Sequence, residues 1–323
     1  MLTANLNANA SAAGVDEGRS AGAAPGPVQL IDALNGVFGK HAGARASHAK
    51  GFCARGEFTP NKDIARFVGS KLFSQGTIAA SLRFSIGGGN PGISDKSRTV
   101  RGLSVRLQDE FETYDLVLIS EPAFFAATPE SFVSFLQARV ADPATKKPDP
   151  EKIAAHNLRF PEGKIQPGLL ASHAAPASYA STAYFSNNAF GFRDKADTLR
   201  WARILVEPAA GVHYLSEEQE KNMPDLFLEE ELKARIAEMP VEFTLYAQLP
   251  AVGDSLNDPS QVWQGNERVA LGTLRVKSIV PQDACDTKVF LPLQLPQGIE
   301  ASDDPILRAR AAAYAVSLKR RTQ

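Results

Sequence analysis

The chain has 323 residues, enough for one large or two small domains and for a core around a bound cofactor. It is 44% hydrophobic and 22% charged, which is ordinary for a soluble globular protein. Because 35 basic residues balance 36 acidic ones, the net charge of -1 gives no reason to expect nucleic acid or a membrane as a partner. No apolar run approaches the roughly 18 residues of a membrane span.

The two cysteines, Cys53 and Cys285, could form one bridge but do not make a disulfide scaffold. We expect Cys53 to be a small apolar filler. The chain contains no Cys-x-x-Cys-His, Cys-x-x-Cys or His-Glu-x-x-His motif. Neither covalent haem attachment nor a zinc site is therefore indicated.

Residues 1–27 are rich in Ala, Gly, Ser and Asn and lack the basic start and apolar core of a signal peptide. We expect a disordered tail here. A cytoplasmic location follows by default, and a periplasmic one would follow if an upstream leader had been removed.

The first half of the chain changes from helical to strand-like patterns. Helical spacing of apolar residues predicts helices over 28–40 and 61–73, with an extended segment over 48–58 between them. Three short strands are expected between about 77 and 119, separated by the loop GGGNPG (87–92) and an acidic turn. A helix opening on Pro129 is expected over 129–141, and 142–170 is expected to be a surface connection.

The second half continues the same mixture of strands and helices. Strands are predicted over 183–192, 198–207, 240–249 and 269–280, and helices over 221–238 and 302–319. The pattern predicts an α+β chain, with residues 28–323 forming one domain built on an antiparallel β-barrel of about eight strands with flanking helices. A barrel of that size can enclose one ligand.

Two residues suggest chemistry before any comparison with known families. His48 has cationic neighbours, Arg45 and Lys50, which favour the neutral imidazole that can accept a proton. Arg310 precedes Tyr314 by four residues, so the two side chains share a helix face and the guanidinium favours the phenolate. A phenolate is a hard anionic ligand for ferric iron.

Four segments resemble a known family in their order and spacing. They are HAKGFCARGEF, RFSIGGG followed by SRTVRGLSVRL, YDLVLISEPAFFAATPESFVSF, and RARAAAY. Together they resemble the haem catalase superfamily, specifically its small catalase-related peroxidases (minicatalase-like), over nearly all of residues 28–323. The resemblance implies an antiparallel barrel fold and a haem b cofactor in a pocket under a distal wall.

The resemblance also implies roles for individual residues. His48 matches the distal base, Ser85 the residue that orients it, and Tyr314 the axial ligand of the haem iron. Cofactor-binding positions are matched by Arg45, Arg83, Phe132, Arg310, Tyr314 and Arg321. The substrate pocket is matched by Ser47, Gly87, Ile119, Phe124 and Phe125.

Four positions differ from typical catalases. Ile119 stands in place of a distal Asn, Gly87 in place of a channel Val, Thr99 in place of a channel Asp, and Ser47 in place of a Val. These changes indicate a wider, less charged approach that is poorly suited to disproportionation of hydrogen peroxide. The chain also ends soon after Tyr314, so we expect a monomer or homodimer rather than an interlocked tetramer.

These features predict a haem peroxidase that reduces hydrogen peroxide or organic hydroperoxides with a small organic electron donor. Three alternatives remain open. They are a true catalase, an enzyme that rearranges fatty-acid hydroperoxides without a reductant, and a haem-binding or sensing protein without turnover. Retention of both His48 and the Arg310–Tyr314 pair speaks against the last, since storage needs no distal base.

Overall fold

The computed structural model describes residues 24–74, 76–286 and 288–323, so most of the predicted N-terminal tail lies outside the described residues. Its strands are β1 Gly51–Pro60, β2 Ile78–Ile86, β3 Arg101–Gln108, β4 Thr113–Ile119, β5 Tyr184–Phe185, β6 Phe190–Arg193, β7 Leu199–Pro208, β8 Val241–Gln248, β9 Arg268–Val280 and β10 Ile299–Ala301. Its helices are α1 Pro27–Phe38, α2 Pro129–Gln137, α3 Pro150–Arg159, α4 Ile165–Ala171, α5 Glu217–Asn222, α6 Leu228–Glu238, α7 Asp283–Asp286 and α8 Pro305–Arg321.

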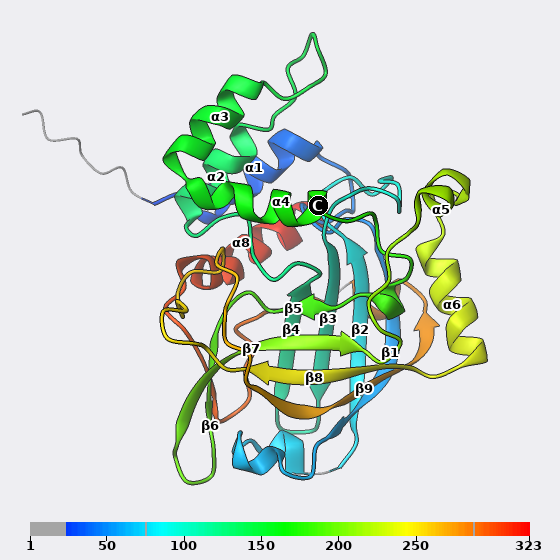
Figure 1. Cartoon of the computed structure of the whole chain (residues 1–323), viewed down its shortest axis with the longest axis vertical. Coiled ribbons are helices and arrows are strands. Elements are labelled where there is room, and N and C mark those ends of the chain that lie inside the picture. Colours follow the sequence, from blue (N-terminus) through cyan, green and yellow to red (C-terminus); the bar gives the residue numbers. More distant parts are fainter. Residues whose placement is uncertain (1–23, 75, 287) are drawn as a thin grey trace, which may run out of the picture.

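The strands form a closed antiparallel barrel (Figure 1). Hydrogen bonds join β7, β5, β4, β3, β2, β1, β9 and β8 in that order, and pairing of β8 with β7 closes the ring. β6 and β10 extend the sheet beyond β7. The predicted α+β architecture with an eight-stranded barrel is confirmed.

Two predicted elements are each divided in two, at residues whose backbone conformation interrupts a helix or a strand. The predicted helix 221–238 is two helices, because Met223 precedes a proline and is extended (φ -67°, ψ 142°). The predicted strand 183–192 is two strands, β5 and β6, separated by Asn187 in the left-handed region (φ 53°).

Two further predictions were wrong in detail. The segment 142–170 holds α3 and nearly all of α4. Asp149 caps α3 because its carboxylate accepts a hydrogen bond from the Glu151 backbone N–H, and Pro150 is the first residue of the helix. The predicted helix 61–73 consists of two short 3-10 turns, Ile64–Arg66 and Lys71–Ser74. Gly69 lies between them and its N–H bonds to the carbonyl of Arg193, which draws the chain away from a continuous helix.

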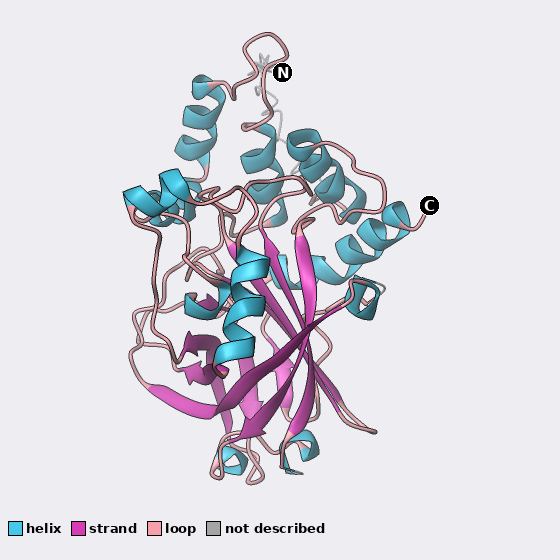
Figure 2. Cartoon of the chain, turned by 90° about the vertical axis from the view of Figure 1, so that its right-hand side faces the viewer, coloured by secondary structure: helices cyan, strands magenta, loops and turns pink. Residues whose placement is uncertain are grey.

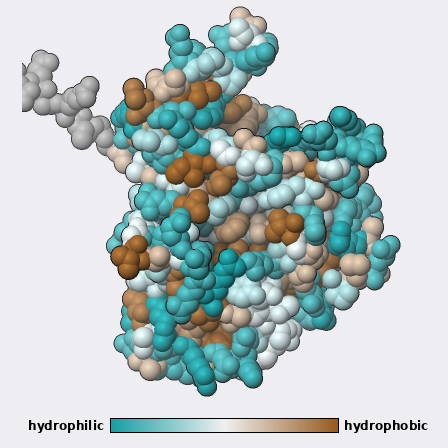
Figure 3. Space-filling model, viewed as in Figure 1, coloured by the Kyte–Doolittle hydropathy of each residue, from teal (hydrophilic) through white to brown (hydrophobic). Residues whose placement is uncertain are grey.

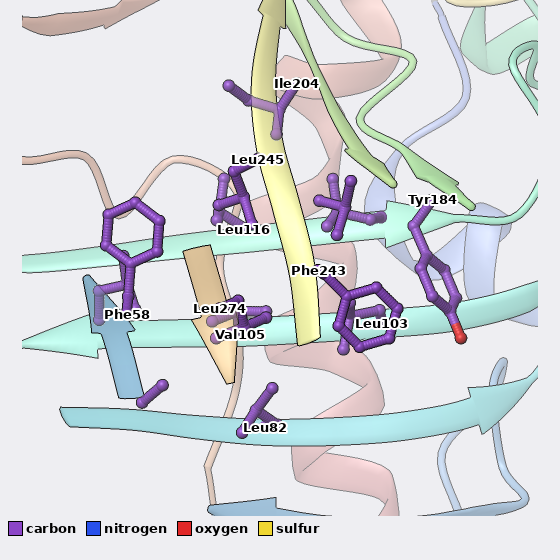
Figure 4. Close-up of a cluster of buried hydrophobic side chains, with 14 of the residues drawn as sticks. Phe58, Leu82, Leu103, Val105, Leu116, Tyr184, Ile204, Phe243, Leu245 and Leu274 are labelled. Atoms are coloured by element: carbon purple, nitrogen blue, oxygen red, sulfur yellow. The ribbon is translucent and has the colours of Figure 1, made fainter. Parts of the chain in front are cut away.

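The barrel interior is filled by side chains (Figure 4). Residues at alternate positions point inward, so Leu82 and Phe84 of β2 and Leu103 of β3 are fully buried among residues from the opposite strands. A barrel of this size can enclose a ligand, but here its interior is occupied by its own side chains. Interior packing of this kind leaves only the outer face of the barrel for a binding site.

A layer of helices lies over one end of the barrel (Figure 2). Apolar residues of α1, α2 and α8 pack together as a second core, which includes Leu30, Ile31, Phe135, Leu136 and Ala313. Much of the molecular face seen in Figure 3 is hydrophilic, with apolar patches among and beneath these helices. No helix in the described ranges is long and apolar enough to cross a membrane.

Candidate active site

A cavity of about 660 Å³ lies between the barrel and the helical layer. The barrel wall is formed by β2, β3 and β4, where Arg83 pairs with Ser104 and Ser85 with Gly102 in adjacent strands. These residues alternate with the inward-pointing core residues, so they lie on the outer face of the sheet. Helices α1, α2, α4 and α8, together with connecting loops, form the remaining walls. The volume falls within the roughly 300–1,000 Å³ that is common for ligand sites.

All thirteen residues to which the resemblance assigns a role at the site line this one cavity. They are Arg45, Ser47, His48, Arg83, Ser85, Gly87, Ile119, Phe124, Phe125, Phe132, Arg310, Tyr314 and Arg321. They come from segments nearly 280 positions apart, which barrel closure and the packing of α8 bring together.

His48 is held in an unusual backbone conformation beside β2. Its φ of 53° lies in the left-handed region, which a non-glycine residue adopts only where its surroundings demand it. Its Nδ1 lies 3.0 Å from Ser85 Oγ. Burial against the cavity wall, with smaller contributions from Arg83, Arg310 and Arg45, lowers the pKa of His48 to about 3. The imidazole is therefore neutral at physiological pH.

Gly102 makes room for this arrangement. A Cβ at this position would lie 2.5 Å from Ser85 Oγ and 2.7 Å from His48 Nδ1. Only glycine lets the imidazole and the serine approach the backbone of β3. A glycine inside a predicted strand is the sequence signal that could have identified this residue.

Three arginines gather at one side of the cavity, and we call Arg45, Arg83, Arg321 and their neighbour Asp286 the arginine cluster. Arg45 Nη1 bonds to Asp286 Oδ1 at 2.8 Å, and Arg321 Nη2 donates to the Asp286 carbonyl at 2.9 Å. Three guanidinium groups thus face one carboxylate. Within the described chain, no Asp or Glu lines the cavity itself.

Arg83 in the arginine cluster is buried and makes few hydrogen bonds. It is only 4% exposed, yet its Nε has no hydrogen-bond partner, and its Nη2 donates to the Ala49 carbonyl at 3.3 Å. Burial, reinforced by Arg45, lowers its pKa to about 9. A buried cation with a free donor is stabilised by an anionic ligand.

A stack of phenylalanines forms an apolar wall of the cavity. The rings of Phe125 and Phe132 lie 5.2 Å apart at 28°, and those of Phe124 and Phe125 lie 4.3 Å apart. Phe135 extends the stack from Phe125 at 4.4 Å. Such a surface suits a flat apolar ligand.

Tyr314 receives two hydrogen bonds from Arg310 on α8. Arg310 Nε and Nη2 lie 3.0 Å and 2.7 Å from the phenolic oxygen. Two N–H donors of one guanidinium thus converge on the phenolic oxygen of Tyr314. The predicted pairing across one turn of helix is confirmed in its geometry.

Asn188 and Asp304 hold Arg310 in place, and no local sequence pattern identifies either residue. Arg310 Nη1 donates to Asn188 Oδ1 at 2.9 Å, and Asn188 Nδ2 donates to Asp304 Oδ2 at 2.6 Å. Asp304 also caps α8 by accepting from the backbone of Ile306 and Leu307. The network joins the β5–β6 connection to the start and middle of α8.

Replacing Asn188 by Ala should lower the free energy of unfolding by about 1–3 kcal/mol, because Arg310 Nη1 and Asp304 lose buried partners. Urea denaturation of the wild type and the variant measures the change. Asn222→Ala, at the exposed end of α5, serves as the control and should stay within about 0.5 kcal/mol of the wild type. Equal losses in the two variants would contradict the network's role.

Gly87 does not simply widen the approach, as the sequence suggested. A Cβ at this position would lie 2.6 Å from Val100 Cγ2 and 3.0 Å from Thr99 Oγ1. The Val100 side chain therefore fills the space that a residue at position 87 would take. Ile119, in contrast, lines the cavity as an apolar residue, as expected.

Cys53 and Cys285 form a disulfide across 232 positions, with their Cα atoms 5.7 Å apart. The expectation that Cys53 is a small apolar filler is wrong. Its partner lies on α7, which follows β9, and β9 pairs with β1 in the barrel. Only the closed fold brings the two cysteines side by side.

Comparison with known proteins agrees with this geometry. The family model described as Catalase matches residues 27–322, nearly the whole chain. The chain belongs to the catalase family. This confirms the resemblance seen in the sequence.

Catalase-family relatives cover most of the chain. Two proteins named catalase-related peroxidase, from Synechococcus elongatus and Mycolicibacterium paratuberculosis, are 36% and 35% identical over 301 residues. These matches cover 92% of this chain and 89% and 95% of theirs. A catalase from Latilactobacillus sakei is 27% identical and is matched over 63% of its length.

Solved catalase structures share the fold. A fungal catalase and catalase A from Saccharomyces cerevisiae each superpose with a TM-score of 0.76 at 24% identity. The match covers 87% of this chain but only 60% and 62% of those chains. This likeness concerns the barrel and its helices alone.

Membership of the catalase family implies a haem cofactor, and the cavity fits one. The arginine cluster has an excess of two positive charges, which equals the charge of two haem propionates. The unpartnered Arg83 Nε offers a donor to such a carboxylate. The phenylalanine stack suits the macrocycle, and Tyr314 offers a phenolic oxygen, a group that can bind haem iron.

Proposed function

We propose that this protein is a haem b peroxidase that reduces hydrogen peroxide or organic hydroperoxides with a small organic electron donor. The observation that carries the proposal is the presence, in one cavity, of a neutral histidine and a tyrosine oxygen paired with arginine. Two relatives that are matched over 89% and 95% of their length bear the name catalase-related peroxidase.

Haem of type b is proposed because neither cysteine of the chain offers covalent attachment. Both cysteines of the chain are joined in the buried disulfide, so neither thiol is free to form a thioether. The arginine cluster, the phenylalanine stack and Tyr314 would hold the group without a covalent link to the porphyrin.

When bound, haem supplies the iron and the redox chemistry. The protein positions a proton acceptor beside it. Ser85 Oγ lies 3.5 Å from the carbonyl oxygen of Gly102 and donates its proton to it. Because the serine hydrogen points to Gly102, the same Oγ can accept a hydrogen bond from His48 Nδ1–H. Nε2 of the neutral ring is then free to take a proton from peroxide and to return it to the departing oxygen.

The side chains around this acceptor favour peroxidase over catalase chemistry. Ile119 offers no hydrogen bond to a second peroxide molecule, and apolar residues of α1 and α2 line part of the cavity. An organic donor or hydroperoxide is therefore the better match for this cavity. We propose weak disproportionation at most.

The disulfide bears on where the protein works. Disulfides persist mainly in oxidising compartments, so the Cys53–Cys285 disulfide supports a periplasmic location over a cytoplasmic one. We also retain the proposal of a monomer or homodimer. Cell fractionation and size-exclusion chromatography test these two points.

The main test is a steady-state assay of the haem-reconstituted protein with a chromogenic donor and either hydrogen peroxide or an organic hydroperoxide. We expect a Soret band at one haem per chain and donor oxidation far above that of free haem. Oxygen evolution from hydrogen peroxide should be slow in comparison. Turnover no higher than that of free haem would refute the proposal, and rapid oxygen release would identify a catalase instead.

A further inference from the structure

The Cys53–Cys285 disulfide lies directly behind the arginine cluster. Cys53 is on β1, where it pairs across the sheet with Arg83, and Cys285 is in the four-residue helix α7, one position before Asp286. Both cysteines are buried, with exposures of 0% and 1%. The disulfide therefore joins the barrel wall to the segment that carries Asp286.

That segment supplies most of the contacts of two arginines. Arg45 reaches Asp286 Oδ1 at 2.8 Å, the Cys285 carbonyl at 3.3 Å and the Lys288 carbonyl at 3.2 Å. Arg321, at the end of α8, donates to the Asp286 carbonyl at 2.9 Å. Both arginines line the cavity, and the backbone around α7 thus holds their guanidinium groups at its wall.

Besides the disulfide, a hydrogen bond and a small apolar cluster connect the α7 region to the barrel. Gln282 Nε2 donates to the Gly51 carbonyl at 2.7 Å, and the cysteines pack in a small apolar cluster with Phe290. A helix of four residues has no stability of its own. The disulfide is the covalent constraint that fixes the position of α7.

We propose that the Cys53–Cys285 disulfide controls haem retention by positioning Arg45 and Arg321, so that its reduction weakens the hold on the propionates. The inference rests on the proposed haem site. Reduction by a dithiol transfers two electrons and two protons, breaks the S–S bond, forms two thiols and converts the dithiol to a disulfide. Freed α7 then no longer holds the two guanidinium groups in place.

The experiment measures the rate of haem loss from the full-length holoprotein to an excess of apomyoglobin. Cys53→Ala/Cys285→Ala should lose haem about tenfold faster than the wild type, the effect of weakening one charge-assisted hydrogen bond. Wild-type holoprotein reduced with dithiothreitol and alkylated should show the same acceleration, which keeps the test open if the double variant folds poorly.

Arginine variants identify the route of the effect. In an Arg45→Ala/Arg321→Ala background, removing the disulfide should cause no further acceleration, because its targets are gone. In an Arg83→Ala background the tenfold effect should persist, since Arg83 bonds to Ala49 and not to α7. Leu274→Ala, which destabilises the barrel core away from the cavity, controls for general loss of stability and should leave haem loss unchanged.

The outcomes separate this inference from the proposed function. If the wild type binds haem and the disulfide-free forms lose it at the same rate, the inference is refuted and the proposed function stands. Acceleration that persists in the Arg45→Ala/Arg321→Ala background also refutes it. A wild type that binds no haem overturns both.

Discussion

His48→Ala is expected to lower kcat/KM for peroxide by about 10²- to 10⁴-fold, the usual contribution of a positioned proton-transfer group. The loss follows because the only imidazole among the cavity-lining residues in the described ranges disappears. Haem stoichiometry should stay at the wild-type value, since the arginine cluster and Tyr314 are untouched. Stopped-flow mixing with peroxide measures the rate constant, and the Soret absorbance measures the haem.

His213→Ala is the matched control, because His213 is exposed and lies outside the cavity. Its activity should equal that of the wild type. Unchanged peroxide reactivity in His48→Ala would remove His48 from the mechanism, whatever the behaviour of the control.

The pH dependence of the same rate constant tests independently whether His48 acts as the proton acceptor. Its pKa is lowered to about 3 by burial and by three arginines, so the proton-accepting form predominates at every pH well above that value. The rate constant should be flat from about pH 5 to 8 and should fall only as acid begins to protonate the ring. An inflection near the ordinary histidine value of 6.5 would contradict the assignment.

Tyr314→Phe is expected to change the ferric absorption spectrum and to weaken haem binding by at least about tenfold. The substitution removes the oxygen that accepts from Arg310 Nε and Nη2 and leaves a guanidinium with two unsatisfied donors. Spectra of the reconstituted proteins and titration with haem measure the two effects.

Tyr246→Phe on β8 is the control for loss of a phenolic oxygen, because Tyr246 does not line the cavity. It should keep the wild-type spectrum and affinity. A ferric spectrum of Tyr314→Phe identical to that of the wild type would exclude Tyr314 as the axial ligand.

The sequence by itself was sufficient for the elements that depend on local pattern. The alternation of apolar residues in β8 and the helical spacing in α1 are visible in a single segment, so these elements were predicted close to their bounds. Ordered motifs around His48 and Tyr314 were sufficient for the family. Pro150 and Pro224 carried boundary signals that the helical predictions did not use.

Tertiary structure decided where the cavity lies and what supports it. The inward face of β2 fills the barrel, so the cavity uses the opposite face, with Arg83 and Ser85. The contact of Asn188 with Arg310 and the bond between Cys53 and Cys285 join positions 122 and 232 apart. Neither partner carries a local pattern that identifies the other. Such pairs form only when barrel closure and the docking of α8 and α7 bring distant segments together, and that information is in the packing of the whole chain.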